Sequence, residues 1–107
     1  MLRKGKWKAM IKRARPTREA AEMLAIQALA FIAEEPERMG AFLGATGIAP
    51  EAIRGAARSG DFLAGVLEHI LADESLLLGF AESVGRDPAE IARARGALGG
   101  QWERDVP

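Results

Sequence analysis

The sequence predicts an all-α protein, and three observations lead to this expectation. The 107 residues include no tyrosine and only three valines, whereas β-strands favour aromatic and β-branched side chains. Alanine contributes 21 of the apolar residues, so we expect a thin core of closely approaching helices. Helix caps and apolar residues at helical spacing recur along the chain and divide it into about six short helices in a compact array.

The first expected helix spans roughly residues 18–34. Thr17 suits its N-cap position, and acidic residues follow near the positive end of the helix dipole. Its main apolar stripe has helical spacing and comprises Ala21, Leu24, Ala28, Phe31 and Ile32. Met23 and Ile26 fall outside that stripe, so the helix is apolar over much of its circumference.

Prolines and glycines delimit the next two helices. Pro36 suits the first turn of a second helix, which is expected to stop at Gly47. Pro50 opens a short third helix that is expected to end near residues 59–60. The joints between the expected helices are only a few residues long, as in other compact helical arrays.

The last three helices are expected to have acidic N-caps. Asp61 is predicted to cap a fourth helix, and Asp73 a fifth helix that ends at Gly85. The sixth helix has the clearest start, because the segment DPAE (residues 87–90) supplies an N-cap, a first-turn proline and a capping-box glutamate. It is expected to run to residues 99–100.

The two halves of the sequence resemble each other, because residues 42–56 align with residues 80–94 at an offset of 38. The matches fall on caps, turns and core positions: Phe42 with Phe80, Gly47 with Gly85, Pro50 with Pro88, Ile53 with Ile91, and Ala56 with Ala94. Any two helix–turn–helix units would share such positions. Our interpretation is that the domain consists of two related three-helix units.

Three consecutive leucines, residues 76–78, lie in the expected fifth helix. Successive helical residues point about 100° apart, so a single buried face cannot accept all three. With Leu76 at zero, Leu78 lies near about 200° and is the outlier. Its counterpart in the first half of the sequence is Gly40. Either this helix is central in the domain and buries Leu78, or Leu78 belongs to a second contact surface.

The formal net charge of zero hides a basic segment attached to an acidic body. Before Glu19 there are eight basic residues and no acidic one, whereas seven arginines stand against fifteen acidic residues from Glu19 onward. We expect a flexible basic arm over residues 1–16, a helical domain over 17–100 and a C-terminal tail over 101–107. The positive charge of the arm would allow it to bind phosphate groups of nucleic acid or an anionic membrane surface. The alternatives are that the arm is an accessory extension without a binding role, or that it docks on the acidic body of the same chain.

Other features of the sequence exclude several kinds of site. The absence of cysteine excludes a disulfide framework, a thiolate zinc site and a cysteine nucleophile. The longest apolar stretch, residues 23–33, is too short to span a bilayer, and the basic start lacks the apolar segment of a signal peptide. We therefore expect a cytoplasmic protein without a transmembrane segment.

The single histidine, His69, is the most plausible residue for chemistry. It belongs to a small polar cluster with Glu68, Asp73 and Glu74. Paired Glu-x-x-His motifs hold di-iron centres, but the residue three before His69 is Val66, and a zinc site of one histidine with carboxylates is atypical. We expect no catalytic residue, no metal ligand and no cofactor, and we do not expect an enzyme.

Residues 80–95 have the outline of a DNA-binding helix-turn-helix. In that arrangement the residues that approach DNA are Arg86, Arg93 and Arg95. The surrounding charge argues against it, because residues 61–107 carry four arginines and nine acidic residues, a poor match for a polyanion.

Three segments of the chain carry a family resemblance: AAEMLAIQALAFIAEEPERMGAFLGATGIAP, FLAGVLEHILADESLLLGFAESVGRDPAEI and the closing WERD. Over about residues 17–105 the chain resembles a small bacterial family of uncharacterised proteins, domain-of-unknown-function family 3572. The resemblance implies a single all-helical domain. It implies no activity, because the family has no established catalytic residues that would carry over to this sequence.

Apolar residues outside the core stripes favour a non-enzymatic protein-interaction or regulatory module. The residues expected to bind the partner, which is another protein or a second copy of the chain, are Met23, Ile26 and Leu78. The alternative is helix-turn-helix DNA binding through residues 80–95, assisted by the basic arm.

Overall fold

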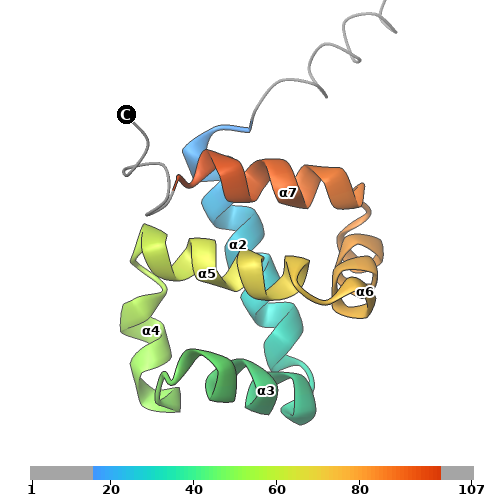
Figure 1. Ribbon diagram of the computed structural model, residues 1–107. Helices are drawn as coiled ribbons and strands as arrows, with labels where there is room; N and C mark the ends of the chain where they lie inside the picture. The colour runs from blue at the N-terminus through green and yellow to red at the C-terminus, as the bar shows by residue number, and fades with distance from the viewer. Residues whose placement is uncertain (1–15, 100–107) are drawn as a thin grey trace, which may run out of the picture.

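The computed structural model describes residues 16–99, and within that range all regular structure is helical. In chain order the elements are α2 (Arg18–Ala33), α3 (Pro36–Thr46), the 3₁₀ turn η1 (Pro50–Ala52), α4 (Ile53–Ala56), α5 (Gly60–Leu71), α6 (Glu74–Val84) and α7 (Pro88–Ala97). The all-α prediction is confirmed (Figure 1). The expected basic arm, apart from Pro16, and the expected C-terminal tail lie outside the described residues.

Side chains cap two of these helices as the sequence predicts. The Thr17 hydroxyl accepts a hydrogen bond from the backbone N–H of Ala20 at 3.0 Å, which starts α2. The Asp73 carboxylate accepts one from the backbone N–H of Leu76 at 3.1 Å, which starts α6. Each bond satisfies a backbone donor that the first turn of a helix leaves without an intrahelical partner.

The N-cap of α5 is Ser59, so the prediction that Asp61 caps this helix is wrong. Ser59 has an extended backbone, and its hydroxyl accepts from the backbone N–H of Phe62 at 3.4 Å. Gly60 is the first helical residue and Asp61 the second, where a negative charge still faces the positive end of the helix. Serine and aspartate are about equally good N-caps, so their side chains alone do not decide where the helix begins.

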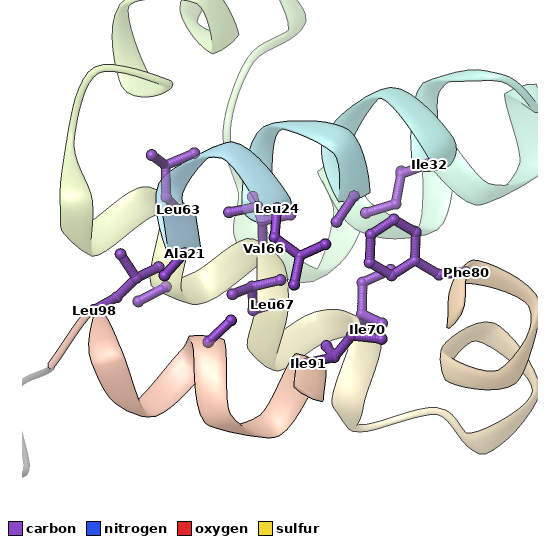
Figure 2. Packing of buried hydrophobic residues seen from close by; sticks show 14 of the residues in the cluster. Ala21, Leu24, Ile32, Leu63, Val66, Leu67, Ile70, Phe80, Ile91 and Leu98 are labelled. Carbon is purple, nitrogen blue, oxygen red and sulfur yellow. The ribbon is translucent and has the colours of Figure 1, made fainter. Parts of the chain in front are cut away.

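The hydrophobic core lies where α2, α5 and α7 pack against one another, with α6 against α5 and α7 and with α3 against α2 (Figure 1). Buried side chains from four helices converge there (Figure 2), including Leu24, Ile32, Leu67, Ile70, Phe80 and Ile91. The apolar stripe predicted for the first helix is this buried face, except that Phe31 is half-buried.

The structure supports the interpretation of two related units. Helices α3 and α6 both have 11 residues, and the bounds of α6 lie 38 residues beyond those of α3. Phe42 and Phe80 occupy matching positions and are both fully buried. Each helix ends at a glycine in the left-handed conformation, Gly47 with φ of 71° and Gly85 with φ of 67°, a conformation that glycine adopts without steric cost.

The two units differ at their third helices. The predicted short helix begins at Pro50 as expected, but its predicted end near residues 59–60 is wrong, because the helical segment ends at Ala56. The first unit has only η1 followed by the four-residue α4, whereas the second has the ten-residue α7. Asp87 and Glu90 form a complete capping box at the start of α7. Ala49 and Ala52 stand at the matching positions of the first unit and offer no side-chain cap. The short element therefore lacks the reciprocal hydrogen bonds that start α7.

Candidate interaction surface

Three large apolar side chains are exposed among the described residues, and they are the three that the sequence predicts to bind a partner. Met23 is 67%, Ile26 is 49% and Leu78 is 52% exposed. The alternative that Leu78 is buried in a central helix is therefore wrong. Exposure places these side chains at the surface but leaves partner binding itself as a prediction.

Met23 and Ile26 lie on the face of α2 that points away from the core. At about 100° per residue, Met23, Ile26, Ala30 and Ala33 fall within about 80° of one another. The centre of this set is about 180° from Ala28, which is fully buried. All four side chains are exposed. We call these four residues the α2 stripe.

The α2 stripe has the 3-4-3 spacing of residues along a helix–helix seam. Its first half is bulky and its second half consists of two alanines, whose small side chains allow another helix to approach closely. Polar residues border it: Glu22, Gln27 and Glu34. Ala30 and Ala33 were not predicted to belong to a binding surface. The signal that would have found them is their spacing from Met23 and Ile26.

The end of α2 is attached to α3 through Arg38. Its guanidinium lies 4.0 Å from the centre of the Phe31 ring and donates from Nη1 to the Phe31 carbonyl oxygen at 2.7 Å. Its Nη2 lies 3.2 Å from a carboxylate oxygen of Glu35. With the Thr17 cap at its other end and a buried inner face, α2 presents its outer face on a well-supported helix.

Leu78 lies on a different surface from the α2 stripe. Helix α6 meets α2 through Phe80, whose ring centre is 5.6 Å from that of Phe31, and through Gly79. Leu78 points about 160° away from Phe80 around the helix axis. The structure thus separates the three predicted residues into a pair on α2 and a single leucine directed away from α2.

A groove of about 360 Å³ lies beside His69, where α3, the end of α5 and the start of α6 meet. Its lining comprises Glu37, Arg38, Ala41, His69, Ala72, Asp73 and Leu76. Three of its polar groups have structural roles: Asp73 caps α6, Arg38 holds Phe31, and the His69 ring packs edge-on against Phe42 at 5.2 Å. Within residues 16–99, no three His, Asp or Glu side chains form a group that could hold a metal ion.

The arginines of the DNA-binding alternative are held in part by carboxylates. Arg86 lies 3.3 Å from Glu90. Arg95 donates from Nε to Glu68 at 2.9 Å and also donates to the Gly99 carbonyl, and its side chain is only 14% exposed. A guanidinium already paired with a carboxylate contributes less to phosphate binding. These contacts weaken the case for a DNA-binding surface, and DNA binding through Arg86, Arg93 and Arg95 stays a prediction.

The family comparison agrees with this description of a single helical domain. Residues 18–101 match the family described as Protein of unknown function (DUF3572). The chain belongs to this family. The DUF3572 match begins at the first residue of α2 and extends past the end of α7, so all the described helices of the domain lie within it. Comparisons with curated proteins and with solved structures gave no match. No helix in the described part of the chain is long and apolar enough to cross a membrane.

Proposed function

We propose that this domain is a non-enzymatic protein-interaction module whose main binding surface is the α2 stripe, with Leu78 as a separate second contact. The observation that carries the proposal is the exposure of Met23 and Ile26, 67% and 49%, on the outer face of the longest described helix. That helix already buries a complete inner face, so its outer apolar residues are not needed for packing within the described domain.

The α2 stripe differs from the scattered apolar residues that any protein surface carries. Met23 and Ile26 are neighbours one turn apart, and Ala30 and Ala33 continue the same line toward the end of the helix. Complete burial of one such large side chain contributes about 1.5–3 kcal/mol, and roughly half of that is still available at a half-exposed position. A partner that covers both large residues would gain about 2–3 kcal/mol from them.

Affinity capture from nuclease-treated cell lysate tests the proposal. The full chain is compared with the double variant Met23→Glu/Ile26→Glu and with the matched control Ala92→Glu, which adds a charge at an exposed position of α7. We expect the native chain and the control to retain the same defined protein, and the double variant to lose it. The variant Leu78→Glu tests the second contact. We expect this variant to retain less of the captured protein than the native chain does, without losing it completely.

Two results would contradict the proposal. The first is equal capture by the native chain and by the double variant, which would place binding elsewhere on the domain. The second is retention of nucleic acid alone before digestion, with loss of that retention in a chain that begins at Pro16. That pattern would support the DNA-binding alternative through the basic segment instead.

A further inference from the structure

We propose that the partner of the α2 stripe is a basic amphipathic helix of another protein, with lysine or arginine side chains on both sides of its apolar seam. The inference rests on the proposed function, because it uses the same surface, and it adds the chemical class of the occupant. Three properties of the described residues lead to it: the spacing of the stripe, the carboxylates that frame it, and the negative charge at the end of α2.

The shape of the α2 stripe suits a helix. Its four residues have the 3-4-3 spacing with which one helix packs along another, over a length of about 15 Å. Met23 and Ile26 project from the first half and are 67% and 49% exposed. Ala30 and Ala33 leave room over the second half for large side chains of the partner. A partner helix with small residues over the first half and large ones over the second fills the whole seam.

Carboxylates frame the stripe. Around the axis of α2, Glu19 lies within about 40° of every residue of the stripe, so it continues the same line at the N-terminal end. Glu22 borders one side, and Glu34 stands just past the C-terminal end on the other side. The single basic residue of α2 is Arg18, whose Nε lies 3.7 Å from a carboxylate oxygen of Glu22. A partner that lies along the stripe therefore meets negative charge at both ends.

The C-terminal end of α2 concentrates this charge. The helix dipole places partial negative charge there, where a lysine, arginine or histidine is favourable, but the last turn of α2 contains no basic residue. Glu34 is the C-cap and Glu35 follows it. The nearby Arg38 already lies 3.2 Å from Glu35 and donates to the Phe31 carbonyl oxygen. Within residues 16–99, Glu34 itself forms no salt bridge, so a cation of the partner gains most at this end.

The same charges disfavour a second copy of the chain as the occupant. An antiparallel copy, the orientation that sets each large residue of the stripe against an alanine, also sets Glu22 of each copy against Glu34 of the other. A parallel copy sets each carboxylate against itself. Residues 16–99 carry thirteen acidic residues and seven arginines, so the described domain repels its own copy and attracts a cationic partner. An anionic membrane surface is repelled in the same way.

Fluorescence anisotropy of a labelled peptide mixed with the full chain tests the inference. The probe is a helical peptide of about 20 residues with a seam of two leucines and two alanines at 3-4-3 spacing and lysines on both sides. Its leucines face the two alanines of the stripe in the antiparallel orientation, which the helix dipoles favour. A second peptide replaces every lysine by glutamate. A third has the composition of the first in an order that breaks the seam.

We expect the lysine peptide to bind with a dissociation constant of about 10–100 µM in about 50 mM salt, because the seam is small for a specific interface. The glutamate peptide and the peptide with the broken seam should bind at least about tenfold more weakly. Raising the salt to about 500 mM should weaken the lysine peptide by roughly threefold or more. No saturable binding of the lysine peptide, or equal binding of either comparison peptide, would overturn the inference.

Two matched pairs of variants locate the peptide on the domain. Glu34→Lys and Glu51→Lys change the net charge equally, the first beside the stripe and the second at an exposed position of η1. Glu34→Lys should weaken the lysine peptide about threefold or more, and Glu51→Lys by less than about 1.5-fold. Met23→Ser should weaken it about tenfold, and Leu78→Ser by less than about twofold. Circular dichroism confirms that each variant is folded. Equal effects within either pair would overturn the inference.

Other occupants of the stripe give different results. A dimer of the native chain that Met23→Ser dissociates, measured by sedimentation equilibrium, would identify a second copy. Cosedimentation with phosphatidylserine vesicles that Met23→Ser abolishes would identify a lipid surface. Either result would overturn the basic helix as the occupant.

The inference and the proposed function fail in different ways. If the double variant Met23→Glu/Ile26→Glu loses the protein captured from lysate, but the lysine and glutamate peptides bind equally, only the basic helix is refuted. If lysate capture is unaffected by that double variant, the α2 stripe itself is refuted as the binding surface.

Discussion

The substitutions Ile26→Ala and Ile32→Ala provide a matched test of the α2 stripe. Both replace isoleucine by alanine in the same helix, and both slightly improve helix propensity. The side chains differ in burial, because Ile26 is 49% exposed whereas Ile32 is fully buried in the core. Any large difference between the two variants therefore reports burial rather than local helix formation.

The expected magnitudes follow from those exposures. Truncation of a buried isoleucine to alanine costs about 2–5 kcal/mol, so we expect Ile32→Ala to lose about 3 kcal/mol after the gain in helix propensity. Ile26 is half exposed, so its truncation removes about 1 kcal/mol of hydrophobic stabilisation. The higher helix propensity of alanine offsets about 0.4 kcal/mol of that loss. The difference of about 2.5 kcal/mol corresponds to a gap in melting temperature of roughly 10–20 °C for a domain of this size.

The assay is thermal and urea unfolding followed by circular dichroism at about 5 µM protein. Equal losses of stability in the two variants would refute the reasoning, because Ile26 would then be buried within the folded monomer.

The remaining predictions concern the elements that support this surface, and urea unfolding at constant protein concentration measures each of them. Gly40→Ala is expected to stabilise the domain by about 0.5–1 kcal/mol, because an added Cβ in the middle of α3 meets no atom within 4 Å. Gly85→Ala should instead destabilise by about 1–2 kcal/mol, since its φ of 67° strains any residue with a side chain; an unchanged stability would show that this turn adjusts. Asp87→Ala removes the N-cap of α7 and should cost about 1 kcal/mol, and a cost below a few tenths would mean that water replaces the cap. Glu68→Gln weakens the contact with Arg95, and we expect a loss below about 1 kcal/mol that shrinks in 0.5 M salt, because the Glu68 side chain is 59% exposed.

The elements that sequence reasoning located well are those with local signals. The starts of α2 and α6 follow from Thr17 and Asp73, and the start of α7 from Asp87 followed by Pro88, because an N-cap and its backbone donor lie within three residues of each other. The start of α5 was misplaced by two residues, because two adequate caps occur close together. The length of the third helix was overestimated, because proline marks a possible start without supplying the hydrogen bonds that a side-chain cap provides.

The candidate surface was only partly predictable. Met23 and Ile26 stood out because they are large and fall off the buried stripe of a helix whose periodicity is clear. Ala30 and Ala33 did not, because alanine occurs on buried and exposed faces alike in this chain. Their importance appears only once the direction of the core fixes the outer face of α2.

The sequence by itself determined that the described part of the chain, residues 16–99, is helical, where most of its helices begin and end, and which residues form the apolar stripe of α2. Those properties depend on contacts between residues within one or two turns of each other. The tertiary structure alone decided that Leu78 is exposed and points away from α2, and that Arg95 is held by Glu68, 27 residues earlier in the chain. Helix periodicity gives the angle between two residues around one helix axis, but only packing between helices that are distant in sequence decides which side of that helix faces water.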